Sequence, residues 1–383
     1  MRIVMLGEVA DINPRAERFP AETQVSFVGM AQLDATSALA TPLSDRQYSD
    51  VANGYTKFRD GDILAAKITP CWENGKVGVA RLGHEIGAGS TEFHVIRPRE
   101  DIHDRYLLHF LRQGRIRSLG ELRMTGSGGQ RRVPAKFLAN LEVPLPSLAE
   151  QSRIAAILDQ ADAIRAKRRQ VLTQLDYLRA AVTGEILGGR EWTSTLADLA
   201  EVQIGPFGSL LHKSDYIQGG VPVINPMHIK DGTLVADNKF SVTEDKAREL
   251  SLYRLRPGDV VMGRRGEMGR AGVVREEHAG FVCGTGSLIL RSHSAAGELL
   301  HAVVTSPRMR SHMERSALGA TLPNLNGSIV SNAPAPELDP ELSNHFDKVS
   351  GALRNLRESS LLSSRSTDEL FALLQTRAFK GEL

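Results

Sequence analysis

The chain has 383 residues, 41% of them hydrophobic and 24% charged, so it can bury sizeable cores in two or three domains, and wholesale disorder is excluded. Its 47 lysines and arginines against 45 acidic residues give a net charge of +2, which excludes a histone-like polycation but allows local basic patches. Cys71 and Cys283 are too few for a disulfide framework or a cysteine-ligated zinc site. With no apolar run near the roughly 18 residues of a membrane helix and an apolar start too short for a signal peptide, we expect a soluble cytoplasmic protein.

The first half of the chain predicts short strands, then helices. Strand-like runs such as residues 62–66 are broken by glycine-rich turns. A short helix is expected around residues 106–119, followed by a Gly/Ser-rich loop. Pro144 and Pro146 mark the boundary before a long helix over residues 150–187, because proline does not fit inside a helix.

The second half repeats this plan. Arg-Asp-Gly-Asp-Ile-Leu at residues 59–64 returns as Arg-Pro-Gly-Asp-Val-Val at residues 256–261, and the Gly-Glu of residues 184–185 returns at residues 381–382, both at an offset of 197. A period this long indicates a duplicated domain with a duplicated tail. The predicted boundaries are one domain at residues 1–147, a long helix at 148–187, a second domain at 188–338 and a second long helix at 339–383.

The first long helix carries a heptad pattern. Eight of ten positions at alternating spacings of three and four are apolar, which is typical of a coiled-coil seam. These positions are Ile154, Ile157, Ala161, Ile164, Arg168, Val171, Leu175, Leu178, Val182 and Glu185. The alternative is an ordinary amphipathic helix packed on its own domain, but 38 residues span roughly 57 Å, more than the diameter of a small domain.

The second long helix continues the pattern with Phe346, Val349, Leu353 and Leu356. Its segment is one heptad longer than the first, and a whole heptad preserves the apolar face, which favours pairing of the two helices. The serine-rich residues 359–366 are weak helix formers, and Ser-Thr-Asp-Glu at 366–369 resembles a new capping box. A break in the second helix therefore stays open.

Catalytic motifs are absent from the sequence. There is no phosphate-binding Gly-x-x-x-x-Gly-Lys-[Ser/Thr] loop, no dinucleotide fingerprint and no Asn/Asp-Pro-Pro-aromatic motif of amino-methyltransferases. Histidines such as His94 and His109 are not at zinc-ligand spacing with cysteines. We therefore expect a chain that does not catalyse a reaction and holds no metal.

Basic residues gather in both repeats despite the near-neutral total. Residues 105–136 hold eight basic residues and one acid, residues 263–275 hold four arginines and one acid, and residues 308–315 hold three arginines and one acid. Arginine forks suit phosphates and guanine edges. Solvated helix faces are the alternative for any single arginine, but recurrence in two repeats favours nucleic-acid binding.

Glycine-rich loops add polar side chains able to read base edges. Residues 125–134 of the first half correspond to residues 318–326 of the second, and the two loops differ more than the strands before them. Small residues let backbone amides approach phosphates, although a plain connecting loop is the alternative. The candidate DNA-binding residues are Lys67, Thr69, Trp72, Asn74, Lys76, Ser127, Gln130, Arg131, Arg132, Arg264, Arg265, Arg270, Thr321, Asn324 and Asn326.

Taken together, these motifs resemble the DNA specificity subunit of type I restriction–modification systems. The resemblance is carried by residues 61–64 and 258–261, by residues 125–130, and by the Pro-Leu-Pro-Ser-Leu-Ala-Glu-Gln segment at 144–151, which opens a long helix. It covers the whole chain. The second copy departs from it at residues 337–342, where the Glu-Gln pair is missing.

The resemblance implies an α+β fold with two similar mixed α/β target-recognition domains in a pseudo-twofold arrangement, separated by two long antiparallel coiled-coil helices. It implies that each domain reads one half of a split site in double-stranded DNA. Two methylation subunits would carry S-adenosylmethionine, and restriction subunits would carry ATP and Mg, so that this chain binds no cofactor. Two other classes stay open: a self-sufficient modification enzyme and a DNA-binding regulator without enzymatic partners.

Overall fold

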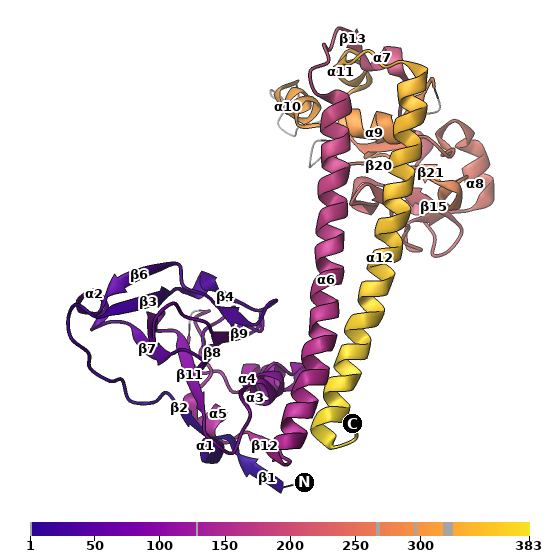
Figure 1. Cartoon of the computed structure of the whole chain (residues 1–383). Helices are drawn as coiled ribbons and strands as arrows, with labels where there is room; N and C mark the ends of the chain where they lie inside the picture. The colour runs from indigo at the N-terminus through magenta and orange to yellow at the C-terminus, as the bar shows by residue number, and fades with distance from the viewer. Residues whose placement is uncertain (1, 128, 266–268, 295–296, 317–324) are drawn as a thin grey trace. The chain divides into compact units, whose positions relative to one another are not determined.

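The computed structural model describes residues 2–127, 129–265, 269–294, 297–316 and 325–383. The chain forms two compact units (Figure 1): unit 1 comprises Met1–Val171 with Ser360–Leu383, and unit 2 comprises Leu172–Ser359. The two long helices, α6 (Leu148–Leu187) and α12 (Pro340–Lys380), each contribute one segment to each unit. The C-terminal residues of the chain therefore fold with its N-terminal half.

The described residues of unit 1 form three sheets. Their strand orders are β1-β12, β6-β3-β10-β7 and β2-β11-β8-β9-β5-β4, and β3–β10 and β5–β9 are the parallel pairs among the described ladders. The strands are β1 (Arg2–Met5), β2 (Ala10–Ile12), β3 (Gln24–Val28), β4 (Leu33–Asp34), β5 (Leu39–Ala40), β6 (Ser44–Gln47), β7 (Thr56–Arg59), β8 (Ile63–Ala66), β9 (Val77–Ala80), β10 (Ile86–Gly89), β11 (Phe93–Pro98) and β12 (Glu142–Leu145).

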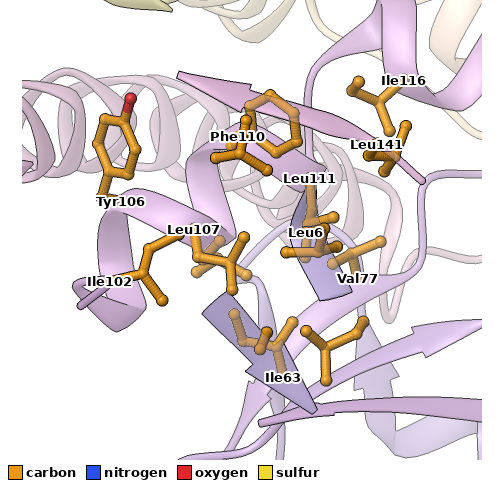
Figure 2. Close-up of a cluster of buried hydrophobic side chains, with 14 of the residues drawn as sticks. Leu6, Ile63, Val77, Ile102, Tyr106, Leu107, Phe110, Leu111, Ile116 and Leu141 are labelled. Atoms are coloured by element: carbon orange, nitrogen blue, oxygen red, sulfur yellow. The ribbon is translucent and has the colours of Figure 1, made fainter. Parts of the chain in front are cut away.

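Short helices cover this strand-rich part and bring the long helices into the same core. They are α1 (Leu6–Val9), α2 (Tyr48–Val51), α3 (Asp104–Leu111), α4 (Gly114–Leu122) and α5 (Ala135–Ala139). Figure 2 shows side chains of α3 in one cluster with Leu6 of α1, where Leu111 lies beside Leu6 and Tyr106 lies at the other side of the cluster. Phe379 of α12 packs against the rings of Tyr106 and Phe110, tilted to the first and edge-on to the second, with centroid distances of 5.0 and 5.5 Å. Burial of these large rings attaches α12 to unit 1.

Unit 2 repeats the architecture. Its described strands are β13 (Ser194–Thr195), β14 (Ala200–Ile204), β15 (Val221–Ile224), β16 (Ile229–Lys230), β17 (Thr233–Leu234), β18 (Ser241–Val242), β19 (Val260–Gly263), β20 (Ala271–Val273), β21 (Val282–Cys283), β22 (Ser287–Ser292) and β23 (Pro334–Ala335). Its short helices are α7 (Leu196–Leu199), α8 (Glu244–Glu249), α9 (Gly297–Thr305), α10 (Pro307–Ser316) and α11 (Gly327–Ser331).

The strand pairing matches between the units as well as the element order. β14-β22-β19-β20 corresponds to β2-β11-β8-β9, and the parallel pair β15–β21 corresponds to β3–β10. The pair β13–β23 likewise corresponds to β1–β12. The duplication predicted from short sequence matches is therefore a duplication of the fold.

The repeated Gly-Asp dipeptide closes the same turn in both units. Gly61 has φ of +82° and Gly258 has φ of +88°, a conformation that glycine adopts without strain. The next residue, Asp62, accepts the backbone N–H of Arg59 at 2.7 Å and forms a bidentate pair with Arg97 of β11 at 2.8 Å per bond. Asp259 pairs in the same way with Arg291 of β22, at 3.0 and 3.1 Å. In both units the dipeptide thus joins a turn to a neighbouring strand.

The second long helix is continuous through its serine-rich part. Helix α12 runs from Pro340 to Lys380 without a break. Ser366 and Thr367 donate their hydroxyl protons to the backbone carbonyls of Leu362 and Ser363, four residues earlier, so they bond within the helix instead of capping a new one. The new helix start suggested by residues 366–369 is therefore wrong.

The two long helices pair antiparallel within each unit. In unit 1, Arg165 of α6 bonds Asp368 of α12 with Nε–Oδ1 2.6 Å, and in unit 2, Arg357 of α12 bonds Asp176 of α6 with Nε–Oδ1 2.6 Å. The sequence numbers of these partners run in opposite directions, as antiparallel pairing requires. The seam of α12 includes buried small residues, Ser350 and Ser364, beside Phe346 and Leu353.

The predicted seam of α6 is wrong at Ile164, Val171, Leu178 and Glu185, which are exposed. Ile154 is buried, and Arg168 and Leu175 are half-buried, as a seam requires. Other predicted seam residues are largely exposed instead: Ile164 by 51%, Val171 by 43%, Leu178 by 47%, and Leu356 of α12 by 57%. Ile157 and Val349 are half-buried at the edge of the same stripe. The contacts of α6 are made one residue later, at Leu158, Arg165 and Leu172.

No helix in the described residues combines the length and the apolar character needed to cross a lipid bilayer.

Candidate nucleic-acid interface

The candidate interface of unit 1 starts in the segment that joins β8 to β9. This segment, residues 67–76, folds on itself through backbone hydrogen bonds: the N–H groups of Trp72, Asn74 and Gly75 donate to the carbonyls of Ile68, Pro70 and Trp72 at 2.8–3.0 Å. Gly75 has φ of +68°, which lets the chain turn into β9. The result is a compact projecting turn with fixed backbone geometry.

The glycine-rich loop after α4 packs against this turn. Thr69 donates its N–H to the carbonyl of Arg131 at 3.0 Å and its hydroxyl proton to the carbonyl of Gly129 at 2.6 Å. Val133 donates its N–H to the carbonyl of Lys67 at 2.8 Å. Two segments about 60 residues apart in sequence thus form one surface, which we call the turn–loop surface (residues 67–76, 125–127 and 129–133).

Most of the predicted side chains of this surface reach solvent. Asn74, Ser127, Gln130 and Arg131 are exposed, and Lys67, Thr69 and Arg132 are half-buried. Lys76 is also half-buried, and its Nζ donates to the carbonyl of Met30 at 2.8 Å. The surface therefore offers both cationic groups and amide or hydroxyl groups, the two kinds that phosphates and base edges require.

Trp72 is the exception, and its assignment to DNA contact is wrong. Its side chain is only 3% exposed and lies in the main core of unit 1. The indole N–H donates to the carbonyl of Arg117 at 2.9 Å, and Gly120 leaves room for the ring, because a Cβ there would lie 2.3 Å from it. Trp72 anchors the turn on α4 and has no polar group left for a ligand.

The adjacent arginines Arg131 and Arg132 have different environments. Arg132 binds Glu92 with two bonds, Nε–Oε2 3.0 Å and Nη2–Oε1 2.8 Å. The hydrogen bonds from Arg132 hold the pKa of Glu92 below its usual range. Arg131 is exposed and its contact with Glu73 is long, at 3.5 Å. Arg132 therefore holds the loop in place, and Arg131 is available to an anion.

Unit 2 places basic residues at the equivalent points. Leu325 donates its N–H to the carbonyl of Arg264 at 2.9 Å, as Val133 does to Lys67. Gly263 donates to the carbonyl of Arg270 at 2.9 Å, as Ala66 does to Lys76 at the same distance. Arg264 and Arg270 thus occupy the positions of Lys67 and Lys76.

The remaining candidates of unit 2 are less uniform. Arg265 is exposed beside Arg264. Asn326 caps helix α11, because its Oδ1 accepts the N–H of Ile329 at 2.8 Å, so its carbonyl is already used and it does not read a base bidentately. Thr321 and Asn324 lie outside the residues that the structure describes.

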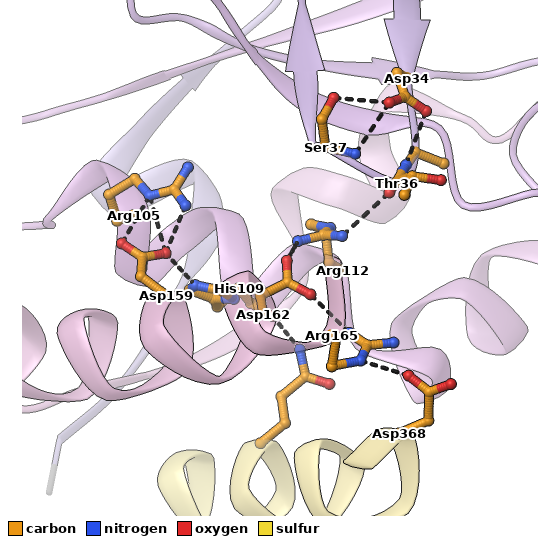
Figure 3. A network of polar contacts seen from close by, with 12 residues as sticks. Asp34, Thr36, Ser37, Arg105, His109, Arg112, Asp159, Asp162, Arg165 and Asp368 are labelled. Carbon is orange, nitrogen blue, oxygen red and sulfur yellow. Dashed lines mark hydrogen bonds and ion pairs between the residues drawn. The ribbon is translucent and has the colours of Figure 1, made fainter. Parts of the chain in front are cut away.

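Part of the basic cluster at residues 105–136 serves the fold instead of a ligand. Figure 3 shows Arg105 and His109 of α3, and Arg112 directly after it, pointing to the carboxylates of Asp159 and Asp162 on α6. Burial alone would raise the pKa of Asp159, but hydrogen bonds from His109 and Arg105 outweigh it and hold the pKa well below its usual range. These ion pairs fix α3 to α6.

Two exposed arginines belong to the basic clusters predicted at residues 105–136 and 308–315 but were not among the candidate DNA-binding residues. Arg117 is the fourth residue of α4, and Arg310 is the fourth residue of α10. Both are exposed. Their equivalence follows from the matching elements. The sequence predicted a single helix around residues 106–119, where the structure has α3 and α4, so counting from the start of the predicted helix would not have revealed it.

The described residues show no site for a metal ion. They contain no group of three or more His, Cys, Asp or Glu side chains arranged to hold one. His94, for example, makes a hydrogen bond with Nε2 2.8 Å from the carbonyl of Val133 and lies beside Asn13, so it supports the glycine-rich loop.

Comparison with known proteins agrees with this architecture. Residues 1–175 match the model of the type I restriction modification DNA specificity domain. The chain is 38% identical over 199 residues to the specificity subunit of the type I restriction enzyme EcoAI of Escherichia coli, which covers 51% of this chain and 34% of that protein. The chain thus spans about a third of the length of the curated relatives that it matches at this identity.

Solved structures extend the likeness over the whole chain. The S subunit of a type I restriction–modification system from M. genitalium superposes with a TM-score of 0.62 at 13% identity, over 99% of this chain and 96% of that one. A chain from a structure of the assembly and conformational transition of the type I R-M system gives 0.57 at 19% identity, over 100% and 98%. At these identities the likeness concerns the fold. The chain has the fold of a type I specificity subunit, and its first 175 residues match the family model of the type I restriction modification DNA specificity domain.

Proposed function

We propose that this chain is the non-catalytic, sequence-specific DNA-binding subunit of a type I restriction–modification complex. Each unit reads one half of a bipartite site in double-stranded DNA through its turn–loop surface or the equivalent part of unit 2. In this role the chain acts in the cytoplasm and binds no cofactor itself. Methylation subunits supply the S-adenosylmethionine chemistry, and restriction subunits supply the chemistry that needs ATP and Mg.

One observation carries the proposal: the two units keep the scaffold and the basic positions but change the polar side chains between them. Lys67 and Lys76 correspond to Arg264 and Arg270 by their backbone hydrogen bonds. Gln130 in unit 1 has no glutamine counterpart in the shorter loop of unit 2. Phosphate contacts position a protein and carry no sequence information, whereas base contacts specify. Two scaffolds of this kind suit two different half-sites.

The long helices provide a surface for the methylation subunits. Ile164 and Val171 of α6 and Leu370 of α12 are 43–55% exposed in unit 1, and Leu178 and Leu356 are 47% and 57% exposed in unit 2. On each helix these exposed residues are spaced by multiples of seven, so they form a stripe along one face. On both helices the stripe lies one position before the seam residues. In an antiparallel pair, equivalent positions of the two helices lie on the same side of the seam, so the two stripes flank the same side. Such an apolar stripe fits helices from a partner subunit.

A domain exchange tests the proposal. Residues 1–147 and 360–383 are replaced together by those of a relative with a known site, because both segments contribute to one core. The methylated sequence, read by methylome sequencing of a host with the full system, should change in one half only. A chimera in which both halves change would contradict a model with one reader in each unit.

Co-purification separates this function from a DNA-binding regulator or a self-sufficient modification enzyme. Methylation subunits from the same host should co-purify with the tagged chain, and the isolated chain should not bind S-adenosylmethionine. Substituting Ile164 and Leu370 together by glutamine should release the methylation subunits, while Ala166→Gln, at an exposed position outside the stripe, serves as a control on the same helix. Methylation by the isolated chain, or failure to recover any methylation subunit, would overturn the proposal.

A further inference from the structure

Both units contain a cavity lined by arginines at the same place in the fold. In unit 1 the cavity has a volume of about 380 Å³ and lies between the β4–β5 turn, Gly75, α4 and the long helices. In unit 2 it has a volume of about 640 Å³ and lies between the β16–β17 turn, Gly269, α10 and α6. The lining elements correspond one to one, except for the long-helix residues.

One arginine occupies the same position in both cavities. A Cβ placed on Gly75 would lie 3.2 Å from Nη1 of Arg117, and a Cβ on Gly269 would lie 3.6 Å from Nε of Arg310. Both glycines have positive φ, +68° and +78°. In each unit the guanidinium group of an arginine therefore lies close to a glycine with positive φ, at a place where a side chain would leave it less room. The side chains around these pairs have diverged, whereas the pairs themselves are present twice.

Positive charge dominates both cavities. Among the described lining residues of unit 1, four cations face one acid, Asp368, which bonds Arg165. Two of these cations, Arg112 and Arg165, also pair with Asp162 of α6, which does not line the cavity. Among those of unit 2, four cations face Asp231. His301 in that cavity is neutral at pH 7, since burial lowers its pKa to about 4. Within the part of the chain that the structure describes, Arg117, Arg179 and Arg310 have no acidic partner.

We propose that each cavity binds a phosphate group of the DNA backbone, held by Arg117 in unit 1 and by Arg310 in unit 2. The inference rests on the proposed function and adds to it a contact that does not depend on base sequence. Asn74 and Gly75 line the cavity and also belong to the turn–loop surface, so a duplex on that surface passes the cavity mouth. A guanidinium group can bind a phosphate through two parallel hydrogen bonds. An arginine at the same position in two units with different loops suits the DNA backbone, because the backbone is the same at every sequence.

The experiment uses the full chain in complex with its methylation subunits. The variants are Arg117→Gln and Arg310→Gln. The matched controls are Arg115→Gln and Arg308→Gln, which remove the same charge from the second residue of the same two helices. Arg115 and Arg308 are also exposed but stack on Phe110 and Trp192, with the guanidinium carbon 5.6 and 4.8 Å from the ring centroids.

Affinity is measured against salt for duplexes with and without the recognised site. Each cavity variant should reduce the log–log salt slope by about 0.9 on both duplexes, the loss expected for one phosphate contact, and should leave the preferred sequence unchanged. The controls should change the slope by much less. Equal effects of variants and controls would show a general charge effect and overturn the assignment.

Neutral methylphosphonates placed one at a time in the duplex identify the source of the phosphate. In each half-site, a methylphosphonate at one position should weaken binding of the wild-type complex. The same substitution should not weaken binding further when the arginine of that unit, Arg117 or Arg310, is already replaced by glutamine. If every position affected wild type and variant alike, a free phosphate or nucleotide would be the occupant and the proposal would be wrong. Poor recovery of methylation subunits with Arg117→Gln, with an unchanged salt slope, would instead indicate a partner carboxylate and also overturn it. A wild-type complex without preference for a bipartite site would refute the proposed function itself.

Discussion

A single aspartate in each repeat joins three features of the fold. Asp62 caps the turn at Arg59, directly precedes β8 and holds Arg97 of β11, and its side chain is 3% exposed. Because its partner is in the neighbouring strand, the ion pair fixes the register of β8 against β11, where Leu64 lies opposite Val95. The repeat of Gly-Asp in the sequence is thus explained by strand pairing, not by ligand contact.

Replacing this aspartate should destabilise its own unit. Asp62→Ala removes both bonds to Arg97 and the cap of Arg59, and leaves a half-buried guanidinium without its partner, so we expect a loss of about 2–3 kcal/mol in unfolding free energy. Urea denaturation of the full chain, with hydrogen exchange of the β8 and β11 amides, measures it. Asp50→Ala, an exposed residue of α2, is the control, and an equally small effect of both changes would contradict the role given to Asp62.

Substituting the two neighbouring arginines of the glycine-rich loop, Arg131 and Arg132, should have different effects on DNA binding. Arg131→Ala should make the salt dependence of DNA affinity shallower by about 0.9 in log–log slope, as expected for one phosphate contact. Arg132→Ala should disturb the loop itself, because Arg132 holds Glu92, and should therefore weaken sequence preference as well as affinity. Binding to specific and random duplexes across a salt series measures both, and an affinity insensitive to salt would contradict DNA binding at this loop.

The sequence predicted the basic clusters but not which arginines serve the fold. Arg105 and Asp159 are 54 residues apart, and Arg132 and Glu92 are 40 apart. No local pattern reports such a pairing, because the chain must fold before the charges meet. The turn–loop surface was predicted better, since its residues lie in two short glycine-rich segments. Trp72 was misassigned because a large aromatic residue in a polar segment suits both stacking and anchoring.

At the scale of elements, the start of helix α9 depends on a carboxylate from α12. Asp347 accepts the N–H of Leu299 at 3.0 Å and that of Glu298 at 3.4 Å. Burial raises the pKa of Asp347 to about 6, although the N–H of Leu299 acts in the opposite direction. In unit 1 the neutral amide of Gln151 performs the same task, accepting the N–H of His103 at 2.8 Å before α3.

This difference gives a pH dependence with a definite sign. The carboxyl of Asp347 has a pKa of about 6 when folded and about 3.9 when unfolded. The folded state therefore binds the proton more tightly, and its stability falls as pH rises from about 4 to about 6. Asp347→Asn keeps an oxygen for the two N–H groups and removes the charge. We expect it to match wild type near pH 4 and to exceed it by about 1–2 kcal/mol at pH 7, since solvent screens part of the shift.

Urea denaturation of the full chain at several pH values measures the difference. Asp339→Asn provides a control, because Asp339 is exposed and accepts the N–H of Leu342 at the start of α12. A difference between Asp347→Asn and wild type that stayed constant from pH 4 to pH 7 would show that Asp347 keeps an ordinary pKa.

The long helices show where reasoning from apolar pattern fails. The pattern correctly predicted two long helices and their pairing, but it placed the most apolar stripe of α6 in the seam. The seam contains Arg165 and Arg168 instead, and small serines on α12, whereas Ile164, Val171 and Leu178 stay exposed. A hydrophobic stripe indicates burial against some surface, and a single sequence does not say whether that surface belongs to the same chain.

For the molecule as a whole, the two chain ends belong to one unit. Residues 360–383 pack on α3 through Phe371 and Phe379, and Arg153 near the start of α6 donates to the carbonyl of Leu383 at 2.7 Å. Each unit thus combines a recognition domain with one segment of each long helix. Neither helix is shortened alone without changing how its partner pairs, so any test of spacing has to remove matched segments.

A matched deletion tests whether the helices set the distance between half-sites. Removing residues 164–170 of α6 together with residues 363–369 of α12 takes out one heptad from each, including both partners of the Arg165–Asp368 pair, and preserves the seam phase. Each helix becomes shorter by about 10 Å, close to three base pairs at about 3.4 Å each. Methylome sequencing should then show the same two half-sites with a gap about three base pairs shorter. Removing residues 164–170 alone should abolish binding, because the seam is no longer matched. A recognised gap that stayed constant after the matched deletion, with full affinity, would mean that another part of the complex sets the spacing.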